Sequence, residues 1–169
     1  MSFLTKSFIT ATDVEGYETH IATDTIAHIH GICTEDQYDT TPLNRVKIFM
    51  NKEWWWTGRE TPEQVIELIQ NAQINALKDL YKTRLPIQPT ADLLNAYAKY
   101  KTTENHCAYI SIDYIEQLYN QTKNYKSVIK TMDGDKIHST TPMDEIIKSI
   151  TIAQKQRLDT IRQCCLGVA

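Results

Sequence analysis

The sequence predicts an α+β fold of two tandem units, each an antiparallel β-meander followed by a helix, with a short helix between the units. Two observations lead to this prediction. Residues 21–29 and 110–118 share the pattern Ile-x-x-Asp-x-Ile, and the elements expected after each segment follow in the same order. Each final helix is introduced by a Thr-Pro pair, at residues 61–62 and 141–142. We therefore interpret the chain as an internal duplication, with its two units related by a pseudo-twofold axis.

The two units are expected to differ at one loop, which has 14 residues in the first (31–44) and 5 in the second (120–124). The expected organisation is a first unit, a connector and a second unit, at residues 1–85, 86–104 and 105–169. Two prolines stiffen the start of the connector. A short helix is expected from Thr90 onward, and it would carry Leu93, Leu94, Tyr97 and Tyr100. The alternative is that residues 97–102 are the counterpart of the first strand, which the second unit otherwise lacks.

Strands are expected where β-branched and aromatic residues lie between turn signals. Asp133-Gly134 is a strong hairpin signal, because a type I′ turn needs positive φ at both central positions. A turn around Gly16 is expected to join the first two strands into an antiparallel pair. Besides the two repeated segments, the expected strands are residues 7–12, 18–22, 46–50, 53–57, 127–131 and 135–139.

Both long helices carry a start signal and an apolar stripe. Thr61 and Gln64 have the spacing of a capping box, in which each side chain bonds the other residue's amide. The first helix should end before Pro86, and the second should start after Thr141 and end near Gly167. Their stripes are Val65, Ile66, Ile69, Ala72, Ala76, Leu77 and Leu80, and Met143, Ile146, Ile147, Ile150, Ala153, Leu158, Ile161 and Cys165.

The composition is that of a globular protein, with 41% hydrophobic and 23% charged residues and a net charge of −3. Residues 1–85 contain 8 Lys and Arg against 12 Asp and Glu, and residues 86–169 contain 10 against 9. Neither half has the basic excess typical of duplex binding. With no signal-peptide pattern and no apolar run near the roughly 18 residues of a membrane span, we expect a cytoplasmic protein that does not enter membranes. The four cysteines are irregularly spaced, and reduced thiols are expected.

His28 and His30 fall on an expected strand, so both imidazoles point to one face. They could ligate a metal, with His20 from the neighbouring strand, or they could be ordinary hydrogen-bonded strand residues. The second interpretation is favoured, because the glycine and the downstream histidine motif of comparable metal sites are absent. We expect no cofactor.

The run Trp54–Trp56 is the most unusual local feature of the sequence. On a strand, Trp54 and Trp56 share one face and Trp55 takes the other, so at least one indole should be in the core. The opposite face is a candidate contact surface for a protein partner, because Trp is enriched at interface hot spots. Arg59 is expected to add an anion or stacking contact to it.

Lysines and tyrosines cluster around the second hairpin. Such a cluster suits phosphate or a nucleotide base, or it is an ordinary solvated hairpin, and the solvated hairpin is the favoured interpretation. The candidate binding residues there are Tyr119, Lys123, Tyr125, Lys126 and Lys136.

The second unit resembles the FlbD-like family of small flagellar and swarming-motility proteins. The resemblance rests on residues 108–118, on residues 128–137 with their Asp-Gly turn, and on residues 142–150 with the motif Asp-Glu-Ile-Ile. It implies a β-meander followed by a capped helix, and no cofactor or reaction. The same segment is also similar to the start of a LytTR DNA-binding domain, whose further strands and basic loops have no counterpart here.

No nucleophile elbow, Walker loop or dinucleotide-binding turn is present in the sequence, so an enzyme is not expected. We expect a binding or assembly protein that acts through a protein partner or self-association, as in a phage or bacterial accessory protein. The alternative hypothesis is a non-catalytic module that binds a small nucleotide or nucleic acid.

Overall fold

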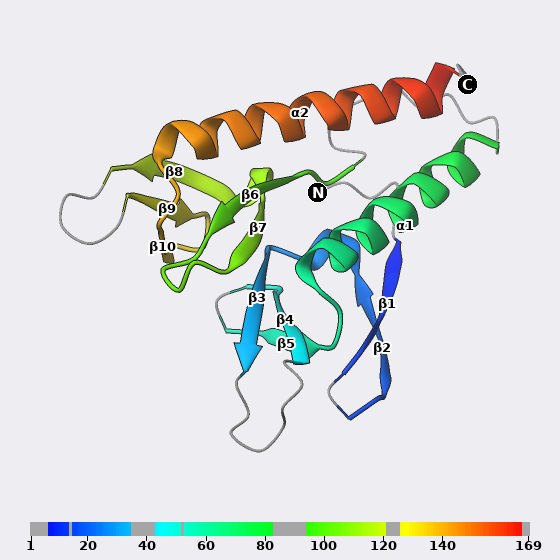
Figure 1. Cartoon of the computed structure of the whole chain (residues 1–169). Coiled ribbons are helices and arrows are strands. Elements are labelled where there is room, and N and C mark those ends of the chain that lie inside the picture. Colours follow the sequence, from blue (N-terminus) through cyan, green and yellow to red (C-terminus); the bar gives the residue numbers. More distant parts are fainter. Residues whose placement is uncertain are drawn as a thin grey trace.

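The computed structural model describes residues 7–13, 15–34, 43–51, 53–82, 94–120 and 126–166. Its described part contains two long helices and antiparallel strands, which confirms the α+β class (Figure 1). Each half of the chain has two strands, a short 3-10 helix, three more strands and a long helix, in that order. After each repeated segment, two strands and a helix follow in the expected order, but each segment itself contains a short 3-10 helix that the sequence did not predict.

In the first half, β1 and β2 pair antiparallel, with Ile9 opposite Ile21, as expected. The capping box at the start of the helix also forms: the Thr61 amide donates to Oε1 of Gln64 at 2.8 Å, and the Gln64 amide donates to the Thr61 hydroxyl at 3.2 Å. The elements are β1 (Phe8–Thr12), β2 (Glu18–Ala22), a 3-10 helix (Thr23–Thr25), β3 (His28–Thr34), β4 (Leu43–Phe49), β5 (Trp55–Gly58) and α1 (Pro62–Lys82).

In the second half, the connector helix expected to carry Tyr97 and Tyr100 is wrong. Tyr97 and Tyr100 lie on a strand, in which Tyr100 is buried, and alternate burial along this strand overrides the helical spacing of its tyrosines. Thr90 and Leu93 lie outside the described residues. The elements are β6 (Tyr97–Lys101), β7 (Cys107–Ser111), a 3-10 helix (Ile112–Tyr114), β8 (Ile115–Tyr119), β9 (Ser127–Thr131), β10 (Lys136–Ser139) and α2 (Met143–Leu166).

A five-stranded sheet of order β5-β4-β3-β7-β6 contains strands from both halves. At its centre β3 pairs antiparallel with β7, and the Ser111 amide donates to the Ala27 carbonyl at 2.8 Å. A twofold relation would require the reciprocal pair, β8 with β2, but these strands belong to two other sheets, β10-β9-β8 and β1-β2. The expected pseudo-twofold is therefore wrong, and the halves are joined head to tail.

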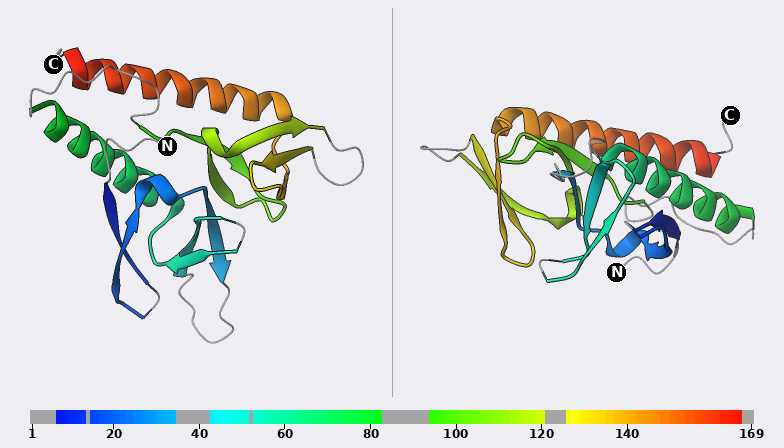
Figure 2. Two further views of the ribbon diagram at one scale, coloured as in Figure 1. Left: turned by 180° about the vertical axis from the view of Figure 1, so that it is seen from behind. Right: turned by 60° about the horizontal axis from the view of Figure 1, so that its bottom comes forward.

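Two hydrophobic cores lie on opposite faces of the five-stranded sheet. The first packs Ile29, Val46 and Ile48 against the β1-β2 hairpin and α1. The second packs Tyr100 and Ile110 against the β8–β10 sheet and the start of α2. The two long helices run along one side of the molecule (Figures 1 and 2). No helix in the described ranges is both long and apolar enough to cross a membrane.

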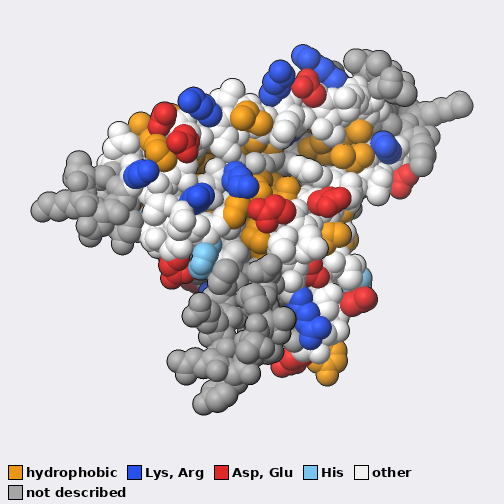
Figure 3. Space-filling model, in the orientation of Figure 1, with side chains coloured by type: hydrophobic (Ala, Val, Ile, Leu, Met, Phe, Trp, Pro, Cys, Tyr) orange, Lys and Arg blue, Asp and Glu red, His pale blue; other side chains and the backbone are white. Residues whose placement is uncertain are grey.

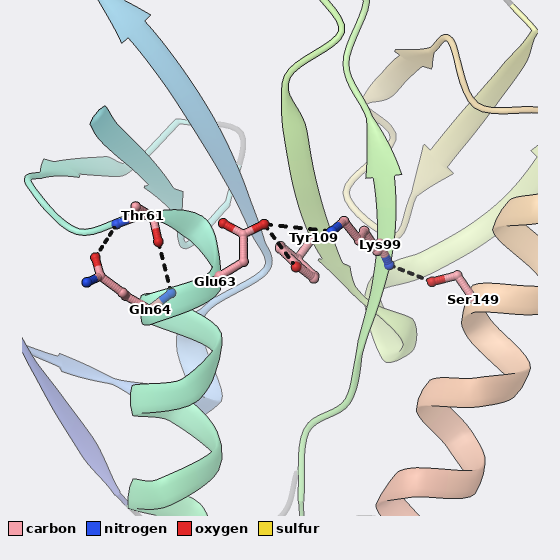
Figure 4. A network of polar contacts seen from close by, with 6 residues as sticks. All are labelled: Thr61, Glu63, Gln64, Lys99, Tyr109 and Ser149. Atoms are coloured by element: carbon pink, nitrogen blue, oxygen red, sulfur yellow. Dashed lines mark hydrogen bonds and ion pairs between the residues drawn. The ribbon is translucent and has the colours of Figure 1, made fainter. Parts of the chain in front are cut away.

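A polar network also links α1 to the second half (Figure 4). The Tyr109 hydroxyl donates to Oε1 of Glu63 at 3.3 Å, and Nζ of Lys99 lies 3.7 Å from the same oxygen. The Lys99 amide donates to the Ser149 hydroxyl at 2.7 Å. One carboxylate at the start of α1 thus contacts β6 and β7, and β6 contacts α2.

Candidate functional site

The second-core face of the five-stranded sheet is only partly covered. Residues opposite one another on antiparallel strands point to the same face, and the register places His28 beside Phe49, His30 beside Lys47, and Phe49 beside Trp55. The β6-β7 part of this face lies under the β8–β10 sheet. The β3–β5 part continues outward as a strip of histidine, lysine and aromatic side chains.

A hollow of about 450 Å³ lies where this strip meets the second half of the chain. His28, His30, Lys47 and Phe49 form the wall from the first half. The wall from the second half comes from the β6–β7 connection and from β10: Thr102, Thr103, Glu104, His106, Asp135, Lys136, Ile137 and His138. The volume falls within the range of small-molecule sites, about 300–1,000 Å³.

The two histidines form the inner part of the hollow and bond each other. Nδ1 of His28 lies 3.1 Å from Nε2 of His30, which also lies 2.5 Å from the Tyr100 hydroxyl. Burial lowers the pKa of His28 to about 3, with a further contribution from His30. Burial also lowers the pKa of His30 to about 4, helped by the charge of Lys47. Both imidazoles are therefore neutral at pH 7, and burial raises the pKa of Tyr100 so that its hydroxyl keeps its proton.

Aromatic rings continue from the inner histidine to the open end of the strip. The His28 and Phe49 rings stack with centroids 4.1 Å apart, and the Phe49 and Trp55 centroids are 6.4 Å apart. Nζ of Lys47 lies 5.0 Å from the Phe49 centroid and 4.1 Å from that of Trp55. Both distances are within cation–π range. A cation and an exposed indole thus lie side by side on the strip, and the cation also lines the hollow.

The structure does not assemble the metal site considered for His28 and His30. His20 lies on β2, in a different sheet, where its Nδ1 is 3.0 Å from the Thr10 hydroxyl. No three His, Cys, Asp or Glu side chains within the described ranges are grouped so that they could hold a metal ion.

The three tryptophans have three different surroundings. Trp54 precedes β5 and is 68% exposed, and Trp55 is 52% exposed on the strip. Trp56 points to the opposite face and packs on the first core. Its ring lies so close to Gly58 that a Cβ there would be 2.2 Å from it. The indoles that a partner could reach are therefore Trp54 and Trp55. Arg59, also expected at this surface, is instead beside the turn at Gly16.

The second hairpin contributes one expected residue to the hollow, Lys136 on β10. Tyr119 is half-buried at the end of β8, and Lys126 is exposed just before β9. Lys123 and Tyr125 lie outside the described residues. The structure therefore places Lys136 at the same hollow as His28 and His30, although nothing in the sequence links the lysine to the histidines.

Sequence reasoning missed Lys47, Phe49 and Trp55 as one group, and it missed Tyr100. The alternation Lys47-Ile48-Phe49 indicates that Lys47 and Phe49 share a face, but only the register of β4 with β5 places Trp55 beside them. Tyr100 reaches His30 through the β3–β7 pairing, for which the sequence contains no local signal.

No protein-family model matches the chain, and no curated protein matches its sequence. A distantly similar solved structure is the LytTr DNA-binding domain of a Bacillus cereus protein described as a methyl-accepting/DNA response regulator. The similarity has a TM-score of 0.44 at 10% sequence identity, over 86% of this chain and 97% of that chain. Chains this different need not share a ligand.

Proposed function

We propose that the protein is a non-catalytic module that binds a nucleotide or a single-stranded nucleic acid in the hollow between its halves. The observation that carries this proposal is the position of the Lys47 ammonium beside the half-exposed ring of Trp55. Single-stranded sites combine an aromatic surface, on which a base stacks, with a cation that contacts the phosphate. Lys136, on the other wall of the hollow, is a second cation for the same ligand.

The other groups of the hollow suit the rest of a nucleotide. Glu104 and Asp135 accept hydrogen bonds, which matches the amino groups of bases and the hydroxyls of a sugar. With two lysines and two carboxylates, the hollow lacks the basic excess of a duplex-binding surface. One or two phosphates and a base are therefore a better match than double-stranded DNA.

The histidines support binding rather than turnover. A general base works best when its pKa is near the working pH, whereas the pKa values of His28 and His30 are about 3 and about 4. At pH 7 such imidazoles are weak bases, and they are not in the imidazolium form that acts as a general acid. Their role in the proposal is to shape the inner wall and to bond polar groups of the ligand.

The test is a titration of the whole protein with ATP, with cyclic nucleotides and with a short single-stranded DNA, followed by tryptophan fluorescence and thermal shift. Trp55→Ala should weaken binding by about 1–3 kcal/mol, the usual contribution of one stacked base. Lys47→Ala should weaken binding and reduce its salt dependence, by a slope of about 0.7 for each lost phosphate contact. Lys155→Ala, which removes an exposed lysine of α2, is the charge-matched control and should leave binding unchanged. The absence of any shift at millimolar ligand would contradict the proposal.

A second candidate function, the holding of a protein partner, is favoured by the exposure of Trp54 next to Trp55. Two adjacent exposed indoles are unusual unless they contact something. Affinity capture with the wild type and with Trp54→Ala separates the two candidates. A partner lost with Trp54→Ala, together with no response to nucleotides, would favour the protein partner.

A further inference from the structure

The two halves of the chain repeat the same backbone contacts, which identifies equivalent residues. In the first hairpin, the Asp13 amide donates to the Tyr17 carbonyl at 2.9 Å. In the second, the Thr102 amide donates to the His106 carbonyl at 3.0 Å, 89 positions later. The same offset relates the Ile-x-x-Asp-x-Ile segments, and therefore β2 to β7 and β3 to β8.

From the fourth strand of each half onward, the offset is 81. Ile29 pairs with Ile48 in the first half, and Leu118 pairs with Ile129 in the second. The backbones of the helices follow the same offset, because the Val65 amide donates to the Thr61 carbonyl at 3.0 Å and the Ile146 amide to the Pro142 carbonyl at 3.1 Å. The two Thr-Pro pairs are 80 positions apart, so the first turns of the helices differ by one residue from the match of the sequences. Each residue of α1 therefore has a defined counterpart in α2.

The halves meet where β3 pairs with β7 and α1 packs on α2, and we call this contact the joint. Because β3 and β7 are not counterparts of each other, the counterpart of each strand is left without such a partner. The outer edge of β3 pairs with β7. The counterpart of β3 is β8 and the counterpart of β7 is β2, and in the described part of the chain both are edge strands. Figures 1 and 2 show β2 and β8 at opposite ends of the molecule. A head-to-tail joint of this kind does not close on itself after two units.

The helices give a second, independent observation: side chains of α1 that are covered at the joint have exposed counterparts on α2. Leu77 of α1 is buried in a cluster with Ile161 of α2, and Ile66 lines the space between the helices. Their counterparts on α2 are Leu158 and Ile147, each 46% exposed. Hydrophobic side chains reach the surface along α2 (Figure 3). Within the described part of the chain, the face of α2 that corresponds to the joint therefore presents two half-exposed apolar side chains.

We propose that this protein assembles head to tail with further copies of itself by repeating its internal joint. The β2 edge of one copy pairs antiparallel with the β8 edge of the next, and α1 of the first copy covers Ile147 and Leu158 of the second. The occupant is a second copy, because the internal joint already shows the partner that such an edge and such a helix face accept. Repetition of the joint builds a ring or a filament, depending on whether the rotation per copy closes.

The internal joint also specifies the register of the joint between copies. Within the chain, His28, Ile29 and His30 lie opposite Ile110, Tyr109 and Ala108. Adding 89 to each β3 residue gives its counterpart on β8, and subtracting 89 from each β7 residue gives its counterpart on β2. The expected pairs between copies are therefore Gln117 with Ile21, Leu118 with His20, and Tyr119 with Thr19. The bond from the Ser111 amide to the Ala27 carbonyl becomes a bond from the Ala22 amide to the Glu116 carbonyl of the next copy.

Disulfide trapping tests this register. Thr19→Cys and Tyr119→Cys are purified separately and mixed under mild oxidation, so that only a pairing between the two edges joins the introduced thiols. We expect a crosslinked peptide that contains both positions, detected by mass spectrometry. Thr19→Cys mixed with Gln117→Cys is the off-register control. Equal crosslinking in the two mixtures, or none in either, would overturn the proposal.

Sedimentation velocity over a range of concentrations tests the assembly itself. The wild type should form dimers and larger species as concentration rises, and Leu158→Glu should shift the distribution toward monomer. The matched control is Ile152→Glu, which changes a residue of the same helix that is 57% exposed, and whose counterpart Asn71 is exposed in the first half. A wild type that stays monomeric at about 1 mM, or a control as disruptive as Leu158→Glu, would overturn the proposal.

A proline at the edge of β2 supplies a second variant. The Thr23 amide donates to the Ser7 carbonyl across the hairpin, so by alternation the His20 amide points away from β1. His20→Pro removes this outward donor and leaves the hairpin bonds in place. It should abolish assembly, whereas His20→Ala should not, with circular dichroism confirming that both variants fold. Assembly unchanged by His20→Pro would exclude the β2 edge.

Discussion

Nε2 of His30 lies 2.5 Å from the hydroxyl of Tyr100, and the two residues come from different halves of the chain. The contact exists because β3 and β7 pair, which places Tyr100 on β6 one strand away from His30. It stabilises the inner end of the hollow and connects the first half to the buried centre of the second core.

Tyr100→Phe should lower the free energy of unfolding by about 1–2 kcal/mol, because a buried polar atom of His30 loses a partner. Urea denaturation measures this change. Tyr109→Phe is the control, since its hydroxyl contacts Glu63 at an exposed site and should contribute less. If Tyr100→Phe and Tyr109→Phe lowered the free energy of unfolding equally, the buried Tyr100–His30 contact would contribute no more than an exposed one, and the prediction would be wrong.

Stability should fall as pH drops from about 6.5 toward 4. The pKa values of His28 and His30 in the folded protein are about 3 and about 4, below the ordinary value of 6.5, so the unfolded chain binds protons first. Each histidine then contributes a slope of about 1.4 kcal/mol per pH unit within this window and none above it. Denaturation midpoints of the wild type and His28→Phe at pH 8 and pH 5.5 check this. A pH difference that is not smaller in His28→Phe would contradict the assignment.

Gly58→Ala should destabilise the protein by about 1–3 kcal/mol, because the new Cβ would meet the Trp56 ring at 2.2 Å and displace it from the first core. The near-ultraviolet circular dichroism should change with the ring. Gly134→Ala offers a contrast, since its Cβ meets nothing within 4 Å but its φ is +84°. This second change should cost about 1 kcal/mol through the backbone alone and leave the tryptophan signal unaltered.

Thr61→Ala should cost about 0.5–2 kcal/mol by removing the acceptor of the Gln64 amide at the start of α1. Thr61→Ser keeps a hydroxyl at the same position and should restore most of the loss. Thermal unfolding monitored by far-ultraviolet circular dichroism measures both variants. No difference between Ala and Ser would mean that the capping box is not a stabilising element.

The sequence by itself determined the helix starts, the hairpin turns and the order of the elements that follow each repeated segment. Thr61 with Gln64 specifies a helix start and Asp133 with Gly134 specifies a hairpin, both through interactions between near neighbours. The repeated Ile-x-x-Asp-x-Ile segments mark equivalent positions in the two halves. The tertiary structure alone decided which edges meet. Period-two alternation shows the face on which a side chain lies but not which strand is its neighbour, so the pairing of β3 with β7 had no local signal. Because of that pairing, residues 97–101 form a strand and the halves are not related by a twofold axis. The same pairing places His28, His30 and Lys47 in one hollow with Lys136. Contacts of this kind join segments far apart in the sequence, so they depend on the packing of the whole chain.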